Sequence, residues 1–226
     1  VYILDGALDV RDSRIIGNSA QGEGGGIASY SSEINASVAI EDSTIADNTI
    51  SDSHMQAATF LNGAGIALHA APLRTATLNV RQSTISDNLV FDRRFIGDTD
   101  LRSRAGGGGI SVIADDPTAT VHLYLVESTL DGNIVHSGTP YQGSDGQADT
   151  YGGGIYYVAG DANSRFRVVS STISNNIAQS TRAEVATARG GGVYVSADAG
   201  DVHIIQSTVS ANTALVQQTA EASAHG

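Results

Sequence analysis

A short phrase of the form Ser-Thr-[Ile/Leu/Val]-x-x-Asn recurs along this chain, and it constrains the fold more than any other feature. It reads STIADN where it first appears in full, and a weaker form, SRIIGN, precedes that copy. A second word, GGGI or a close variant, lies between consecutive copies. The full copies begin at Ser43, Ser83, Ser128, Ser171 and Ser207. Two motifs that alternate at a period of roughly 30 to 45 residues are typical of a solenoid, in which each repeat forms one coil that stacks on the next.

Apolar and polar residues alternate around each phrase. Apolar residues stand five and three residues before each Ser, as Leu78 and Val80 do, and again two residues after it, as Ile85 does. A period of two indicates β-strands with one buried face, and no segment shows the period of an amphipathic helix. We therefore expect two or three short strands in each repeat. The predicted fold is all-β, a right-handed parallel β-helix of about six coils that forms a single domain over residues 1–226.

The Asn that ends each phrase is predicted to occupy a corner of the coil. Asn tolerates the left-handed backbone conformation, and stacked Asn side chains can hydrogen-bond from one coil to the next. The glycine word is predicted to form a second corner, where the backbone takes a positive φ or approaches another segment closely. Both motifs are therefore interpreted as structural rather than catalytic. The predicted corner ladder consists of Asn18, Asn48, Asn88, Asn133, Asn176 and Asn212.

The pairing of the two words, as in STISNN at residues 171–176 and GGGIY at residues 152–156, resembles the right-handed β-helix repeats of bacterial surface proteins. The similarity covers nearly the whole chain and is greatest to the chlamydial polymorphic outer-membrane protein repeats (GGA[ILV] with FxxN) and to choice-of-anchor surface proteins. This chain departs from the chlamydial pattern because Ile, Leu or Val stands where Phe begins FxxN. The resemblance implies export, surface display and an adhesive or structural role, without implying one ligand.

A formal net charge of −12 and the absence of Lys and Cys limit the functions open to this chain. The acidic balance argues against binding nucleic acid, and without Cys there is no thiol nucleophile or thiolate metal site. No apolar run approaches the length that crosses a bilayer, so no direct membrane insertion is expected. These features suit an extracellular or bacterial cell-surface location. Because the chain starts at Val1 within repeat material, we expect a fragment of a longer surface or secreted protein.

The segments between each Asn and the next glycine word vary most in length, and we predict that they are long loops along one edge of the stack. One of them carries Arg93 and Arg94 near several carboxylates, which suits either contact with an anionic sugar or surface ion pairs. Another places Asp145 and Asp149 among glycines, a weak calcium candidate that an ordinary turn also explains. No other metal site or cofactor is predicted. The predicted loops are Thr49–Leu61, Leu89–Ala105, Ile134–Tyr151 and Ile177–Arg189.

Tyrosines are further candidate ligand-binding residues. The alternation after the glycine word places Tyr157 inside the β-helix and Tyr156 outside it, and the same parity places Tyr194 outside one coil later. Tyr141 and Tyr151 are expected to lie nearby, beside the predicted loops. Exposed aromatic side chains bind sugars or protein partners. The alternative is a cross-strand Tyr pair that only stabilises the sheet.

Three functions fit this sequence. The favoured one is a non-enzymatic extracellular or cell-surface protein of structural or adhesin type, with a glycan or a surface protein as its partner. The second is the subunit of an extracellular fibre that associates end to end through unpaired strand edges. The third is a polysaccharide lyase or hydrolase, because the pectate-lyase-like superfamily resembles this chain in fold. The sequence shows no convergent set of titratable residues, and no catalytic residue is predicted.

Overall fold

Strands account for all the regular secondary structure in the part of the chain that the computed structural model describes, which is residues 1–52, 60–92, 102–138, 147–181, 185–197, 200–217 and 221–225. Neighbouring strands pair in parallel and in register. These ranges contain no apolar helix of membrane-spanning length.

The strands form five parallel sheets, which we call A to E. Sheet A contains β1 (Tyr2–Leu4), β5 (Ile27–Ser31), β10 (Ile66–Ala70), β15 (Ile110–Ala114), β20 (Ile155–Val158) and β25 (Val193–Ser196). Sheet B contains β2 (Gly6–Arg11), β6 (Ala36–Glu41), β11 (Thr75–Arg81), β16 (Thr120–Val126), β21 (Arg165–Val169) and β26 (Asp201–Ile205). Sheet C contains β3 (Arg14–Ile16), β7 (Thr44–Ala46), β12 (Thr84–Ser86), β17 (Thr129–Asp131), β22 (Thr172–Ser174) and β27 (Thr208–Ser210).

The other two sheets lie on the opposite side of the coil. Sheet D contains β4 (Ser19–Ala20), β8 (Thr49–Asp52), β13 (Leu89–Asp92), β18 (Ile134–Gly138), β23 (Ile177–Thr181) and β28 (Thr213–Gln217). Sheet E contains β9 (Phe60–Asn62), β14 (Arg102–Gly106), β19 (Gln147–Tyr151), β24 (Val185–Arg189) and β29 (Glu221–His225).

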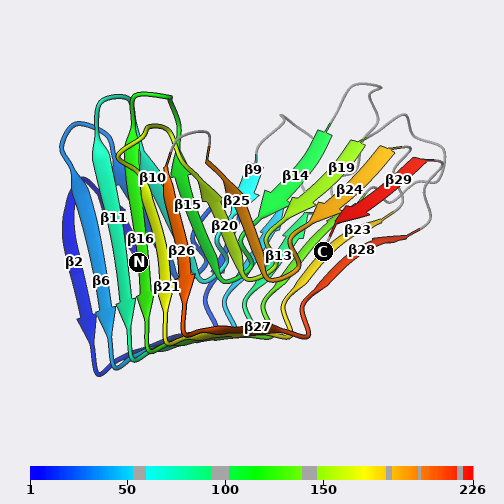
Figure 1. The fold of residues 1–226 in the computed structure, drawn as a ribbon, viewed down its shortest axis with the longest axis horizontal. Coiled ribbons are helices and arrows are strands. Elements are labelled where there is room, and N and C mark those ends of the chain that lie inside the picture. Colours follow the sequence, from blue (N-terminus) through cyan, green and yellow to red (C-terminus); the bar gives the residue numbers. More distant parts are fainter. Residues whose placement is uncertain are drawn as a thin grey trace.

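The chain visits the sheets in the order A to E, and each round makes one coil. The second coil, for example, runs from β5 to β9, after which the chain enters β10 beside β5. The coils stack side by side along one axis (Figure 1). In the first coil a single bridge between Glu23 and Asn62 stands where later coils have a strand of sheet E. The fold is therefore the right-handed parallel β-helix of about six coils that the repeats predict.

Each full coil has five strands rather than the two or three expected. The extra strands lie in the segments predicted to be long loops, at the beginning and end of each segment. Most inward positions of sheet E hold small residues, which give a weak alternation signal. In sheet D, β8, β13 and β18 each have one large aliphatic inward residue, Ile50, Val90 and Val135, which is too few to show a period of two. Residues 53–59, 93–101, 139–146 and 182–184 of these segments lie outside the described residues. The buried inward residues of sheet E include Ser103, Ala105, Ala148, Thr150, Ala186 and Ala188.

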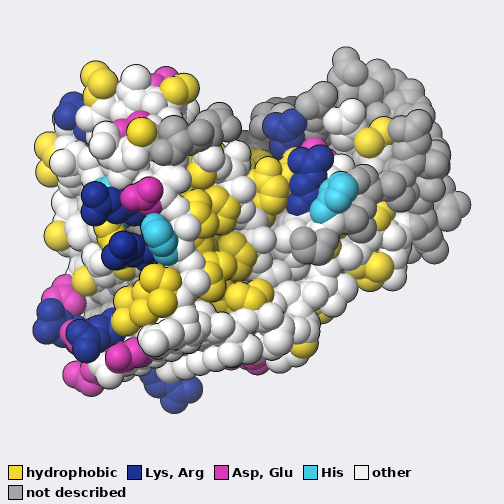
Figure 2. All heavy atoms as spheres, in the orientation of Figure 1, with side chains coloured by type: hydrophobic (Ala, Val, Ile, Leu, Met, Phe, Trp, Pro, Cys, Tyr) yellow, Lys and Arg dark blue, Asp and Glu magenta, His cyan; other side chains and the backbone are white. Residues whose placement is uncertain are grey.

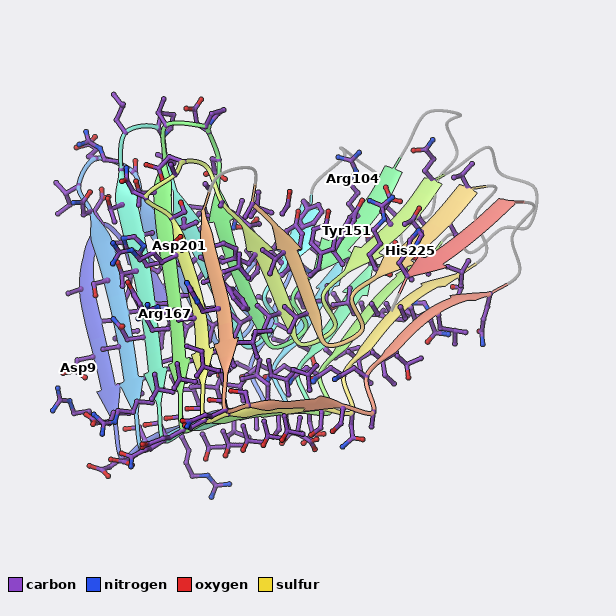
Figure 3. All side chains as sticks on the ribbon, in the orientation of Figure 1. Asp9, Arg104, Tyr151, Arg167, Asp201 and His225 are labelled. Carbon is purple, nitrogen blue, oxygen red and sulfur yellow. The ribbon has the colours of Figure 1, made fainter. Side chains whose placement is uncertain are left out.

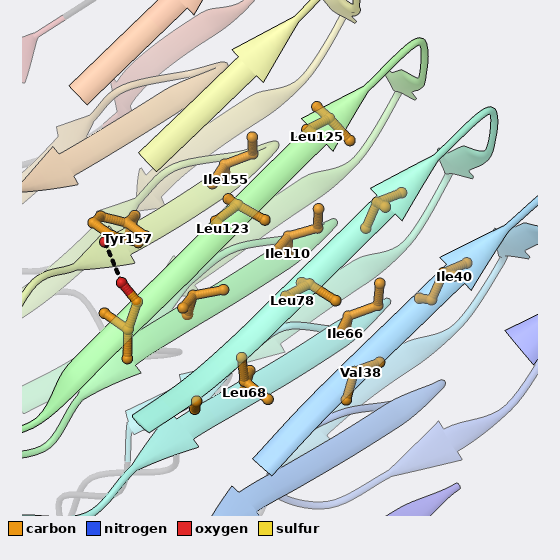
Figure 4. Close-up of a cluster of buried hydrophobic side chains, with 14 of the residues drawn as sticks. Val38, Ile40, Ile66, Leu68, Leu78, Ile110, Leu123, Leu125, Ile155 and Tyr157 are labelled. Atoms are coloured by element: carbon orange, nitrogen blue, oxygen red, sulfur yellow. Dashed lines mark hydrogen bonds between the residues drawn. The ribbon is translucent and has the colours of Figure 1, made fainter. Parts of the chain in front are cut away.

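Sheets A, B and C enclose the larger of two interiors, which we call the large lobe. Its side chains are aliphatic and form columns along the axis, as Ile66, Leu78 and Ile85 do in one coil. Figure 4 shows how these columns interleave between sheets A and B. Tyr157 adds a polar group, and its hydroxyl donates a hydrogen bond to the Val121 carbonyl oxygen at 2.8 Å. Each fully buried aliphatic side chain contributes about 1.5–3 kcal/mol, so this lobe supplies most of the apolar stabilisation.

Sheets D and E enclose a second, smaller interior, which we call the small lobe. Apolar side chains such as Val90 and Val135 occupy only part of it. Polar groups fill the remainder and bond to one another. The Ser103 hydroxyl donates to Asp92 Oδ2 at 2.6 Å and lies 2.7 Å from the Ser137 hydroxyl. These side chains are fully buried, so the small lobe is held by hydrogen bonds as well as by apolar contact.

A waist separates the two lobes where each glycine word packs against the Asn that ends a phrase. A Cβ on Gly153 would lie 2.5 Å from the carbonyl carbon of Ile177, and one on Gly154 would lie 3.0 Å from Asn176 Cγ. Side-chain carbons do not approach backbone so closely, so Gly153 has to be glycine. The first glycine of each word has a positive φ, as predicted for this corner. The two motifs recur together because the Asn side chain and the backbone after it occupy the space that the missing Cβ atoms of the glycines leave free.

The Asn side chains form a continuous ladder through this waist. Asn88 Nδ2 donates to Asn133 Oδ1 at 2.9 Å, and the Asn88 backbone N–H donates to the same oxygen at 3.2 Å. Its second Nδ2 hydrogen bonds to the carbonyl oxygen of Ile45, in the preceding coil, at 3.0 Å. The pattern repeats between each pair of neighbouring coils. Each interior Asn amide is thus fully buried and fully bonded.

The left-handed residue at this corner is the one before Asn, which differs from the expectation that Asn itself would adopt that conformation. Its φ lies between 54° and 69° in every coil. The Asn side chain has to point inward to reach its neighbours, so the bend falls one residue earlier. The residues in the left-handed conformation are Gly17, Asp47, Asp87, Gly132, Asn175 and Ala211.

Candidate functional site

The outer faces of sheets A and E face each other across a notch, which we call the inter-lobe groove. Tyr151 of sheet E lies 5.0 Å from Tyr194 of sheet A, measured between ring centroids, and 5.6 Å from Tyr156. The space-filling view shows the notch between the lobes, with arginine and histidine side chains on its small-lobe side (Figure 2). The groove exists because the glycine corner turns sheet E back alongside sheet A.

An aromatic cluster lines the C-terminal half of the groove. Tyr156 and Tyr194 are cross-strand neighbours with ring centroids 5.6 Å apart, and Phe60 lies 5.2 Å from Tyr156. Gly106 makes room for this packing, because a Cβ there would lie 2.9 Å from the Tyr156 ring. Burial raises the pKa of both Tyr156 and Tyr151, so their hydroxyls stay protonated. The cluster offers ring faces and neutral hydroxyl groups.

The structure brings together three of the tyrosines singled out in the sequence. Tyr156 and Tyr194 point out of sheet A, as predicted, and Tyr151 meets them from sheet E. All three rings are partly buried, because they pack on one another. Their role as ligand-binding residues stays a prediction. Tyr141, with Arg93 and Arg94, lies outside the described residues.

Two residues of the cluster were missed by the sequence analysis. Phe60 lies in a segment interpreted as a loop, although the alternation Phe60-Leu61-Asn62 would have placed its ring outside a strand. Gly106 directly precedes the glycine word at residues 107–110. A glycine directly before that word has no separate sequence signature.

Charged side chains flank the aromatic cluster on sheet E. Arg104 Nε lies 3.7 Å from Asp149 Oδ2, and Tyr151 pairs with Arg189 in the strand register. Figure 3 shows Arg104, Tyr151 and His225 along the side of sheet E that borders the groove. Asp149, the weak calcium candidate, thus has an arginine partner, and Asp145 lies outside the described residues. Among the residues that the structure describes, no group of three or more His, Cys, Asp or Glu side chains is arranged to hold a metal ion.

A second cluster lies at the N-terminal end of the groove and joins four coils. His69 Nδ1 lies 3.1 Å from Asp115 Oδ1, and His69 Nε2 lies 3.3 Å from Glu23 Oε2. Tyr30 stacks on the His69 ring, with centroids 5.0 Å apart. Burial raises the pKa of Glu23, while the neighbouring His69 acts in the opposite direction. The sequence could not reveal this cluster, because only the coil register brings together residues about forty-six positions apart.

A cavity of about 370 Å³ opens beside Glu23. Its walls come from both sides of the groove: Tyr30 belongs to sheet A, whereas Phe60 belongs to sheet E. Phe60 also packs against Tyr156, so the cavity adjoins the aromatic cluster. The groove therefore has an aromatic half and an acidic end, and the ring of Phe60 belongs to both.

Comparison with known proteins gives no relative. No family model, no curated protein and no solved structure matches this chain. A functional proposal therefore has to rest on the sequence, the fold and the geometry of the groove.

Proposed function

We propose that this protein is a non-enzymatic extracellular or cell-surface β-helix of adhesin type, and that it binds a glycan in the inter-lobe groove. The observation that carries the proposal is the aromatic cluster of Phe60, Tyr151, Tyr156 and Tyr194. Aromatic rings stack on the apolar faces of sugar rings, while phenol hydroxyls hydrogen-bond to sugar hydroxyls. The resemblance of the repeats to those of bacterial surface proteins, and the acidic Lys-free composition, support the same location.

The direction of the groove favours a linear ligand. The four aromatic residues come from several coils, and coils repeat at about 4.8 Å along the axis. A ligand that touches all of them has to extend along the stack. A polysaccharide chain meets this requirement better than a compact small molecule does.

The double substitution of Tyr156 and Tyr194 by Ala tests the proposal. Binding to an array of bacterial and host glycans is measured for the wild type and the variant, with circular dichroism to verify the fold. An aromatic contact contributes about 0.5–1.5 kcal/mol beyond area burial, so we expect the loss of two rings to lower affinity about tenfold. Tyr124→Ala is the matched control, because Tyr124 lies on the outer face of sheet B, away from the groove. Unchanged binding by the double variant would overturn the proposal.

A specific observation also favours the second candidate function, end-to-end association. Val202, Ile204 and Val209 of the last described coil are 45–47% exposed, whereas Phe166, Val168 and Ile173 at the same positions one coil earlier are 0% exposed. Hydrophobic side chains gather around β25 and β26 in the space-filling view (Figure 2). Such a surface suits a further coil, including one from a second copy.

Light scattering of the 226-residue chain over a range of concentrations tests this association. If copies stack end to end, scattering rises with concentration, and Ile204→Lys abolishes the rise by placing a charge in the contact. A strictly monomeric wild type at high concentration would rule the association out.

A further inference from the structure

The cavity at the N-terminal end of the inter-lobe groove has features of a binding pocket. Its volume of about 370 Å³ falls within the range of ligand pockets, roughly 300–1,000 Å³. Two aromatic rings, Tyr30 of sheet A and Phe60 of sheet E, line the cavity together with Glu23. A pocket with aromatic walls and one carboxylate selects ligands by charge as well as by shape.

Two hydrogen-bond acceptors beside this cavity have no donor within the described part of the chain. Among the residues that the structure describes, none donates a hydrogen bond to the buried Glu23 Oε2 or to Asn62 Oδ1, and Asn62 is only 1% exposed. Asn62 Nδ2 donates weakly to the other Glu23 oxygen, at 3.3 Å, which holds the two side chains together. His69 Nε2 is 3.3 Å from Glu23 Oε2, but their geometry is not that of a hydrogen bond. Buried acceptors without donors are costly, so a ligand that supplies donors is favoured here.

The charges of Glu23, His69 and Asp115 indicate what kind of hydrogen-bond donor the ligand supplies. Glu23 and Asp115 flank a single imidazole, His69. The two carboxylates outnumber the one imidazole, so acidic groups are in excess in the cluster. An ammonium group provides three N–H donors and a positive charge, and it gains further from the faces of Tyr30 and Phe60. A neutral hydroxyl provides one donor and no charge.

The ring of Phe60 connects this pocket to the aromatic cluster. It lines the cavity and also lies 5.2 Å from the ring of Tyr156. A ligand in the pocket therefore continues directly into the part of the groove suited to sugar rings. We infer that the pocket binds the free ammonium group of an amino-sugar unit in the glycan, with Glu23 as the charged contact and Tyr30 and Phe60 as its walls. This inference rests on the proposed glycan binding.

Calorimetric titration of the folded chain with two oligosaccharides of equal length, one of glucosamine and one of N-acetylglucosamine, tests the inference. The two probes differ at one nitrogen, which is a cationic ammonium group in glucosamine and a neutral amide in N-acetylglucosamine. A charge-assisted hydrogen bond changes affinity about tenfold or more, so we expect the glucosamine oligomer to bind at least tenfold more tightly. Glu23→Gln should remove this preference and leave binding of the acetylated oligomer unchanged. Glu33→Gln, which changes an exposed carboxylate in the turn after β5, is the matched control and should behave as the wild type.

Equal affinity of the wild type for the two oligomers would overturn the inference, as would a Glu23→Gln variant that keeps the preference. In either case, loss of acetylated-oligomer binding in the Tyr156→Ala, Tyr194→Ala variant would still support the proposed function. Binding of neither oligomer would count against both. Tighter binding of a short lysine peptide than of the glucosamine oligomer would assign the pocket to a protein partner instead.

Discussion

The large lobe and the small lobe of the coil are built from the same kind of strand but are stabilised differently. The large lobe buries columns of Ile, Leu and Val, which contact one another without directional bonds. The small lobe buries Ser, Thr and Asp side chains that have to meet specific partners, such as Thr150 Oγ1, 3.0 Å from Ser180 Oγ. A hydrophobic interior tolerates changes of shape, whereas a polar one depends on every member.

The two lobes also differ in how much they vary from one coil to the next. The large lobe is the invariant part of each coil, because its strands and its Asn corner keep one register through the stack. The small lobe contains the segments whose length varies most between repeats. Both clusters of the inter-lobe groove use the outer faces of sheets A and E, where the two lobes meet. Variation in the small lobe therefore changes the groove without disturbing the large core.

The waist offers the most severe way to break the relation between the lobes. Gly153→Ala would place a Cβ 2.3 Å from the Gly191 carbonyl oxygen, in a contact made only of backbone. We expect a loss of more than about 3 kcal/mol in the free energy of unfolding, measured by urea denaturation followed by circular dichroism. Gly22→Ala is the control, since a Cβ there meets nothing within 4 Å. A Gly153→Ala variant as stable as the wild type would contradict the described waist.

A pair of cavity-creating substitutions compares the two interiors directly. Leu123→Ala in the large lobe should cost about 3–4 kcal/mol, because the residue is fully buried among aliphatic neighbours. Val135→Ala in the small lobe should cost about 2 kcal/mol, since it removes two carbon groups at about 0.8 kcal/mol each and leaves a smaller cavity. Urea denaturation of both variants gives the two values. Equal losses would mean that the lobes are equally well packed.

Removing a hydroxyl group from the polar interior of the small lobe should lower the free energy of unfolding by less than the cavity-creating substitutions do. Ser137→Ala removes the partner 2.7 Å from the Ser103 hydroxyl inside the small lobe. The expected loss is about 1–2 kcal/mol, the cost of one buried hydrogen bond. Ser51→Ala, on an exposed position of the same sheet, should change stability by less than about 0.5 kcal/mol. A Ser137→Ala variant no less stable than the control would show that the hydroxyl network is not stabilising.

The smallest effect concerns the pH dependence of stability at Glu23. Burial raises the pKa of Glu23 above its ordinary value of 4.5 in the folded state, so the folded protein holds this proton more tightly than the unfolded chain does. The contribution of Glu23 to stability is therefore complete below pH 4.5 and declines as pH rises through the raised pKa. Glu23→Gln should remove this decline, because glutamine has no carboxyl group that binds a proton in this range. Thermal unfolding of both proteins from pH 4 to pH 8 measures the difference, and parallel curves would contradict the prediction.

The large lobe and the outward tyrosines of sheet A could be predicted from the sequence, whereas the small lobe and the His69 cluster could not. The period of two around each phrase identifies the strands of sheets B and C, and the parity after the glycine word places Tyr157 inside and Tyr156 outside. In sheet E, small inward residues such as Ala148 give no comparable signal, and the strands of sheet D lie in segments whose variable length favours loops. The contacts of His69 depend on the stacking register of coils, which no local pattern encodes.

The Asn ladder gives the coil stack a polarity. Every amide-to-amide bond runs the same way, from Nδ2 in one coil to Oδ1 in the next coil toward the C-terminus. Aligned bonds of this kind polarise one another, so a coil in the middle of the row is held more firmly than one at its margin. The two ends of the stack are therefore different: one presents an Asn acceptor and the other an Asn donor. Any coil that extends it has to approach with donors facing Asn18 Oδ1 or with an acceptor facing Asn212, and in no other orientation.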